Sequence, residues 1–137
     1  MYHYVRPIIG SEFPNLKGLE LDKFRMQLDF LEDNYSIVSS EQVIDAIVNN
    51  KSLPSKSCWL TFDDGYKDHY KYVFPELIKR NLTGAFFPPR GVIKEKKLLN
   101  ANSIHHILSS CNNIDNLIDE LKNQCFNLKI TKHQFEK

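Results

Sequence analysis

The chain has 137 residues, of which 42% are hydrophobic and 26% charged, and its formal net charge is +1. This composition is typical of one globular domain, and the nearly balanced charge gives no electrostatic reason to expect binding to nucleic acid or to an anionic membrane surface. Its apolar runs are much shorter than the roughly 18 residues of a membrane span. The first ten residues lack the pattern of a secretion signal. We therefore expect a cytoplasmic location, and a secreted or periplasmic one only if an upstream segment is missing.

Strands and helices alternate from the start of the chain. The aromatic and β-branched run MYHYV (1–5) predicts a short strand that stops before Pro7. A loop comes next, and then apolar residues at helical spacing predict a helix over 21–31. The run YSIV (35–38) predicts a second strand. Ser39, with Gln42 three residues later, fits a capping box that opens a helix over 41–50.

The same alternation continues to about residue 90. The run CWLTF (58–62) is apolar without alternation, which is typical of a strand buried on both faces of a parallel sheet. Apolar residues at helical spacing predict a third helix over 70–78, and GAFFP (84–88) predicts a fourth strand closed by two prolines. A helix between each pair of strands implies parallel strands and right-handed crossovers, and hence an α/β fold.

The pattern changes near residue 98. Apolar residues continue at helical spacing, and no further strand is predicted. A complete parallel barrel needs roughly 200 residues or more. We expect the first part of a barrel over 1–97, followed by a helical insertion or extension over 98–137, with the barrel incomplete in this chain.

An acidic pair ends the third predicted strand. Asp63 and Asp64 stand directly before Gly65, whose freedom at positive φ permits a sharp turn. Two close carboxylates raise one another's pKa unless a cation neutralises them, so a metal on one and a water activated by the other is a chemically consistent arrangement. Two structural alternatives remain open: an Asp-Gly hairpin turn, and a cap on the next helix. The segment after Gly65 is helical in period, which argues against the hairpin.

A third alternative is phosphoryl chemistry through an aspartyl phosphate or a Mg²⁺-dependent switch. Proteins of that kind carry a second acid two residues after the first. Here Gly65 and Tyr66 stand two residues after Asp63 and Asp64, so the required acid is missing.

Three segments together resemble one known family. LTFDDGY (60–66) resembles the first motif of the polysaccharide deacetylases, the NodB-homology or carbohydrate esterase family four enzymes. GAFFP resembles the strand that comes after this motif. MYHYV resembles the first strand of the circularly permuted branch, which includes bacterial poly-N-acetylglucosamine deacetylases. The resemblance covers about residues 1–90.

The resemblance implies a distorted (β/α) barrel, a divalent metal, usually zinc, and hydrolysis of N- or O-acetyl groups on a sugar, which is hydrolysis of a carbon–nitrogen bond in the N-acetyl case. By motif position, Asp63 is implied as the general base, Asp64 as a metal ligand and His3 as the general acid. The implied partner is an acetylated sugar or polysaccharide, and no residue is assigned to bind it.

One part of the family pattern has no match. The family's other two metal ligands come from H-[ST]-x-x-H, and no two histidines of this chain are four residues apart; they are His3, His69, His105, His106 and His133. The adjacent pair at 105 and 106 is expected to lie at the surface or to contact a partner, and His69 to be solvated or to make a packing contact.

The unmatched ligands limit what this chain is expected to do by itself. We expect an incomplete zinc site and little or no autonomous activity. Unpaired strand edges favour self-association. A non-catalytic carbohydrate-binding or assembly module derived from a deacetylase is the alternative function.

Overall fold

The strands are short and pair in parallel. The computed structural model describes residues 1–128, and an isolated parallel bridge between Tyr2 and Phe62 connects the N-terminal segment to the strand before the acidic pair. The ladders are β1 with β2, β3 with β4, and β5 with β6. Their bounds are β1 Val5–Arg6, β2 Leu19–Glu20, β3 Ser36–Ile37, β4 Ser57–Cys58, β5 Thr61–Asp63 and β6 Ala85–Phe87. The expected α/β class with parallel strands is confirmed.

Helices separate most of the strands and then continue alone. A π-helix, His69–Val73, runs directly into α3. The α-helices are α1 Leu21–Asn34, α2 Ser40–Val48, α3 Phe74–Lys79, α4 Arg90–Glu95, α5 Asn100–Ser110 and α6 Ile114–Asn127. The capping box at α2 is present in both directions, because the Ser39 hydroxyl accepts from the Gln42 backbone and the Gln42 side chain accepts from the Ser39 backbone.

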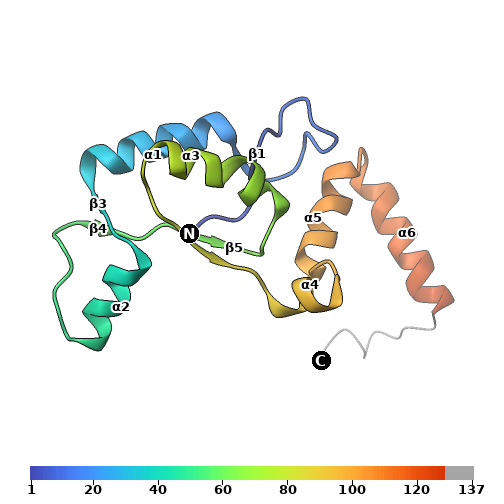
Figure 1. Cartoon of the computed structure of the whole chain (residues 1–137). Coiled ribbons are helices and arrows are strands. Elements are labelled where there is room, and N and C mark those ends of the chain that lie inside the picture. The colour runs from blue at the N-terminus through green and yellow to red at the C-terminus, as the bar shows by residue number, and fades with distance from the viewer. Residues whose placement is uncertain (129–137) are drawn as a thin grey trace.

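The apolar core lies between the helices α1 and α3 and the strand β5. Figure 1 shows α1 and α3 together on one side of β5. Phe62 is fully buried, and its ring stacks on those of Tyr2 and Phe86 at centroid distances of 5.2 and 4.9 Å. Phe24 of α1 meets it edge-on at 6.1 Å. This cluster fixes the position of β5, and therefore of the acidic pair at its end.

Several expected elements differ in detail. The predicted strand over 1–5 is divided into the Tyr2 bridge and β1, and 58–62 is divided into β4 and β5, because the two halves of each run pair with different neighbours. The strand β2 and the helix α4 were not predicted. The third helix begins as a π-helix, since Pro75 has no N–H to complete the regular ladder at that point.

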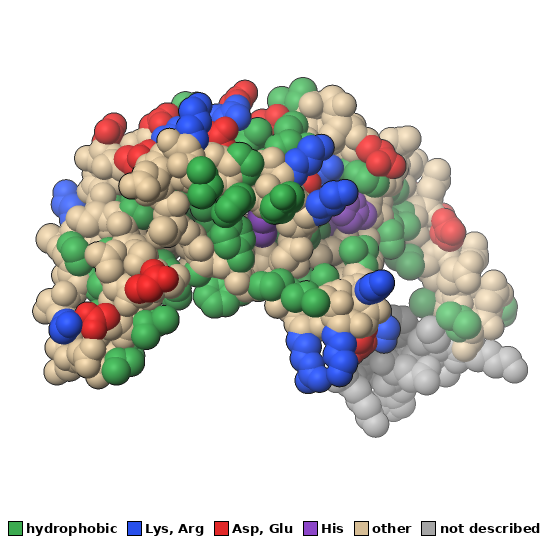
Figure 2. Space-filling view, viewed as in Figure 1, with side chains coloured by type: hydrophobic (Ala, Val, Ile, Leu, Met, Phe, Trp, Pro, Cys, Tyr) green, Lys and Arg blue, Asp and Glu red, His purple; other side chains and the backbone are tan. Residues whose placement is uncertain are grey.

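The helices α5 and α6 form a separate arm beside the strands (Figure 1). They agree with the helical pattern expected from residue 98, and the last part of that expected segment, 129–137, lies outside the described residues. Apolar side chains are visible on the outer surface of this arm and of α2 (Figure 2), and Ile47, Ile118 and Phe126 are among the large exposed apolar residues.

Within residues 1–128, none of the helices combines the length and the apolar character needed to cross a membrane.

Candidate active site

A tight turn carries the acidic pair out of the sheet. The strand β5 ends at Asp63, and both Asp64 (φ 72°) and Gly65 (φ 67°) have left-handed backbone conformations. The turn at Gly65 was predicted, whereas the positive φ of Asp64 was not; aspartate is one of the few non-glycine residues that visit this region. A Cβ on Gly65 would lie 2.6 Å from the Cβ of Pro88, so the close approach of the segment after β6 also requires glycine here.

The structure brings His3 and Asp64 into direct contact, although 61 residues separate them in the sequence. The His3 Nδ1 lies 2.9 Å from Asp64 Oδ2, and the two side chains are 48% and 21% exposed. Burial raises the pKa of Asp64, but hydrogen bonds from His3 and Tyr66 outweigh it, so the net pKa lies below its ordinary value. Asp64 is therefore an ionised carboxylate at neutral pH, held beside a histidine that solvent can reach.

Asp63 lies beside this pair, but it is not among the residues that line the cavity between the N-terminal segment and α5. Its backbone N–H donates to the Tyr2 carbonyl at 2.9 Å, and it pairs with Phe87 in the β5–β6 ladder. Because strand residues alternate, its side chain lies on the face opposite the buried Phe62. The parallel bridge between Tyr2 and Phe62 places His3 next to Asp63 in register, so all three predicted residues lie at one end of β5.

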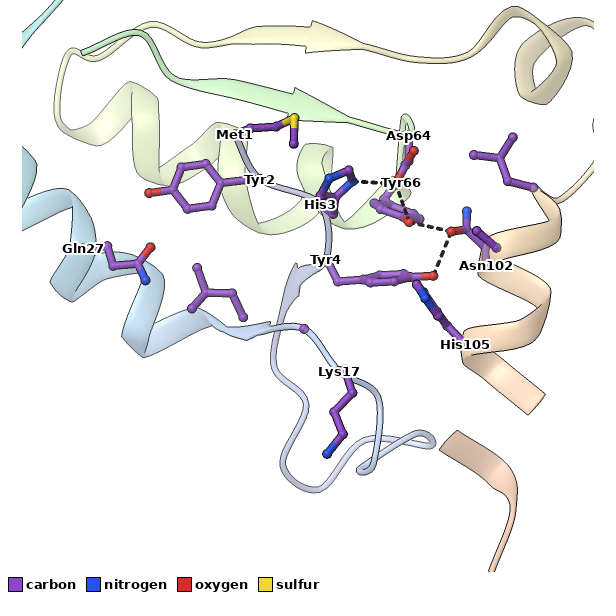
Figure 3. A pocket seen from close by; sticks show the side chains of 14 residues that line it. Met1, Tyr2, His3, Tyr4, Lys17, Gln27, Asp64, Tyr66, Asn102 and His105 are labelled. Atoms are coloured by element: carbon purple, nitrogen blue, oxygen red, sulfur yellow. Dashed lines mark hydrogen bonds and ion pairs between the residues drawn. The ribbon is translucent and has the colours of Figure 1, made fainter. Parts of the chain in front are cut away.

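Two tyrosines and an asparagine extend the site toward α5 (Figure 3). The Tyr66 hydroxyl lies 2.7 Å from Asp64 Oδ2 and 2.7 Å from Asn102 Oδ1, and the Tyr4 hydroxyl lies 3.0 Å from the same Asn102 atom. Burial, followed by hydrogen bonding with Tyr4 and Asp64, raises the pKa of Tyr66 far above its usual range, so it stays protonated. The sequence did not indicate Asn102, which is 36 residues from Tyr66 and belongs to no motif.

His69 supports the site from inside the core. It is 3% exposed, its Nε2 lies 2.6 Å from the His3 carbonyl oxygen, and its ring packs against Phe62. A carbonyl only accepts, so Nε2 carries the proton, and Nδ1 is buried without a partner among residues 1–128. Of the two expectations for His69, the packing contact is the one that the structure shows.

The adjacent histidines of α5 occupy different surroundings. His105 is exposed and lines a cavity beside α5, whereas His106 is half-buried with its ring 4.7 Å from that of Phe13. His133 lies outside the described residues.

The cavity that His105 lines has a volume of about 590 Å³ and opens between the N-terminal segment and α5. His3, Tyr4, Asp64, Tyr66 and Asn102 are among its lining residues, together with Lys17, Gln27 and His105. Its size is in the range of ordinary small-molecule sites, and it combines aromatic faces with a few converging polar groups.

The described donors do not by themselves make a zinc site. In residues 1–128, no three His, Cys, Asp or Glu side chains come together as potential ligands. Catalytic zinc takes three protein ligands and a water. Asp64 and His3 supply two donor groups, and Asp64 Oδ2 is already shared by His3 and Tyr66.

Comparison with known proteins gives a consistent result. The family model for polysaccharide deacetylase matches residues 50–116. The poly-beta-1,6-N-acetyl-D-glucosamine N-deacetylases of Escherichia coli K12 and O157:H7 are each 46% identical over 54 residues, which is 39% of this chain. The chain matches only 8% of the length of these curated relatives.

Two solved structures are similar over a larger part of the chain. A de-N-acetylase from Aggregatibacter actinomycetemcomitans aligns with a TM-score of 0.53 and 33% identity, covering 64% of this chain and 35% of its own. A Streptococcus pyogenes deacetylase, solved in complex with acetate, aligns with a TM-score of 0.54 and 25% identity, covering 75% and 48%.

Proposed function

We propose that this chain, which is similar to the polysaccharide deacetylases over the part matched, contributes to hydrolysis of acetyl groups on an acetylated carbohydrate. The observation that carries the proposal is the contact between His3 and Asp64 at the end of β5, within the segment that resembles deacetylases. The strands that hold this contact are proposed to be part of a distorted (β/α) barrel.

The three acidic and basic groups have different surroundings, which support different roles. Asp63 is proposed as the general base, since its half-exposed carboxylate makes no hydrogen bond to the described side chains. His3 is proposed as the general acid, because its exposed ring can reach a leaving amine and Asp64 can stabilise its protonated form. Asp64 is proposed as a metal ligand, through the carboxylate oxygen that His3 and Tyr66 leave free.

The metal is proposed to be divalent, with zinc first. Bound at Asp64, it would supply Lewis-acid activation of a water molecule. Because the described donors are too few, the proposal requires further ligands from outside residues 1–128. Titration calorimetry with Zn²⁺ tests it: Asp64→Asn is expected to weaken binding strongly and Asp63→Asn only slightly. Equal loss in both variants would contradict Asp64 as the ligand.

The function is tested by release of acetate. The purified chain is incubated with zinc or cobalt and an acetylated chito-oligosaccharide, alone and after restoration of any downstream coding sequence. Acetate release that is lost in Asp63→Asn and Asp64→Asn supports the proposal. If the restored protein also releases none, the deacetylase proposal fails. Sugar binding that survives both substitutions without acetate release would favour the alternative, a binding module.

A further inference from the structure

The contacts around Asn102 contain a conflict in hydrogen positions. Three short contacts join Tyr4 to Asn102, Asn102 to Tyr66 and Tyr66 to Asp64. Each contact between two oxygen atoms needs one hydrogen. The two tyrosine hydroxyls supply one each, and an amide oxygen and an ionised carboxylate supply none. One of the three contacts would therefore place two oxygen atoms 2.7–3.0 Å apart with no hydrogen between them.

Rotation of the Asn102 amide by half a turn removes this conflict. The amide nitrogen then occupies the shared position and donates one hydrogen to each tyrosine oxygen. The Tyr66 hydroxyl keeps its own hydrogen for Asp64 Oδ2, so each of the three contacts has a donor. The oxygen and nitrogen of an asparagine amide are distinguished by the network around them, and here the network selects the nitrogen.

Asn102 is a buried polar residue whose side chain contacts two tyrosine hydroxyls. It is 5% exposed, whereas its helix neighbours Ala101 and Ile104 are exposed. The two tyrosine rings stack with centroids 4.3 Å apart, so their hydroxyls are held side by side toward α5. A buried amide without partners costs free energy, and at this position both of its partners are tyrosines of the candidate site.

We propose that Asn102 is a positioning residue whose amide nitrogen donates to Tyr4 and Tyr66, so that the Tyr66 hydroxyl is directed to Asp64 Oδ2. The other carboxylate oxygen of Asp64, which His3 and Tyr66 do not contact, is then left for the proposed metal. The catalytic part of this inference rests on the proposed deacetylase function, whereas the hydrogen-bond directions do not. The helix α5 thereby becomes part of the site.

Nuclear magnetic resonance of the full chain tests the directions without any substrate. Both side-chain amide protons of Asn102 are expected to show nuclear Overhauser effects to the ring protons of Tyr4 and Tyr66. Absence of these effects, with the amide protons directed away from the tyrosines, would overturn the proposal. This result is independent of whether the chain releases acetate.

Substitution tests the link to Asp64. Asn102→Leu removes the amide at similar size, and Tyr66→Phe removes the connecting hydroxyl. Both are expected to shift the ¹⁵N resonances of the His3 ring, which contacts the same Asp64 oxygen, and the double variant is expected to match Tyr66→Phe. An unchanged His3 spectrum in Asn102→Leu would overturn the positioning role.

The matched control is Ser109→Ala on the same helix. Ser109 is 6% exposed, and its hydroxyl donates to the His106 carbonyl at 2.9 Å, so its loss loosens α5 without touching the tyrosines. The His3 resonances should stay in place in this control; a shift equal to that of Asn102→Leu would indicate a merely structural effect. In a protein that releases acetate, Asn102→Leu should lower kcat about 10- to 100-fold with little change in KM, and an unchanged kcat would contradict the role.

Discussion

The strand-containing part of the molecule and the arm formed by α5 and α6 are stabilised in different ways. Within residues 1–128, every buried apolar side chain lies between Tyr4 and Leu77. The arm instead buries the polar Asn102 and Ser109, and α6 buries no residue. The first part is thus held by an apolar core, whereas α5 meets it through the hydrogen bonds of Asn102 and the ring contacts of His105 and His106. Stability and site geometry should therefore respond to different substitutions.

The largest difference between the two parts is expected for phenylalanine. Phe62→Ala removes a fully buried ring from the core and should lower the free energy of unfolding by about 3–5 kcal/mol. Phe126→Ala in α6, where the ring is 84% exposed, should change it by less than about 0.5 kcal/mol. Urea unfolding followed by the fluorescence of Trp59 measures both. Similar losses in the two variants would show that apolar packing in the arm also contributes to the free energy of unfolding.

The second comparison uses glycine. Gly65→Ala places a Cβ at positive φ and 2.6 Å from Pro88, and should cost about 1–2 kcal/mol or more from backbone conformation and crowding. In Gly91→Ala the new Cβ meets open space within the helix α4, so this variant should gain about 0.5–1 kcal/mol. Opposite signs of the shift in urea midpoint are the expected result, and a gain in Gly65→Ala would mean that the turn is less constrained than its backbone angle indicates.

The third comparison uses ion pairs between α1 and α3 and within α6. The Arg25 Nε and Nη2 donate to one oxygen of Glu76, whose side chain is 11% exposed. Glu76→Gln should cost about 1.5 kcal/mol, the lower end of the range for charged hydrogen bonds, because Arg25 is 41% exposed and screened. Asp119→Asn removes an (i, i+3) pair with Lys122 at 70% exposure on both sides and should cost about 0.3 kcal/mol.

Ionic strength separates the two pairs further. The small effect at Asp119 should vanish in about 1 M salt, whereas most of the effect at Glu76 should persist, since its carboxylate is largely shielded from solvent. Equal salt dependence would argue that the Arg25–Glu76 pair is as solvated as the one in the arm.

The sequence predicted those elements of the fold whose pattern is contained in a few consecutive residues. The capping box of Ser39 and Gln42 and the helical periods of α1, α5 and α6 are of this kind. The two-residue strand β2 carries no such signal, because it exists through pairing with β1. The π-helix before α3 could have been anticipated from Pro75, which lies within the predicted helix.

The sequence predicted which residues of the candidate site lie together where this follows from the positions of the strand ends. The meeting of His3 with Asp64 results from parallel strands that end at the same edge of a sheet. The roles assigned to Asp63, Asp64, His3 and zinc remain predictions. Asn102 could not be found from sequence, since nothing local distinguishes a buried asparagine on an otherwise amphipathic helix from an exposed one.

The smallest expected effect concerns pH and the histidine inside the core. His69 is buried among aromatic rings, whereas His105 on α5 is exposed. Burial, only partly offset by its bond to the His3 carbonyl, lowers the pKa of His69 below the ordinary 6.5. Between the lowered value and 6.5 the unfolded chain binds more protons than the folded one, so stability is full above about pH 6.5 and falls as the pH decreases through that window. The physical cause is that a second proton would occupy Nδ1, which is buried without an acceptor among the described residues.

A non-titrating replacement isolates this contribution. His69→Gln can keep a donor toward the His3 carbonyl but cannot take up a proton, so it should be less stable than the parent at about pH 7.5 yet lose less stability on acidification to about pH 5.5. Urea midpoints of both proteins at the two pH values measure the difference. An identical decrease in both proteins would place the acid sensitivity elsewhere, and a parent protein that gained stability on acidification would contradict the direction of the shift. Because His69 contacts the His3 carbonyl, a confirmed decrease would connect the acid sensitivity of the fold to the residue that holds the His3 backbone in place.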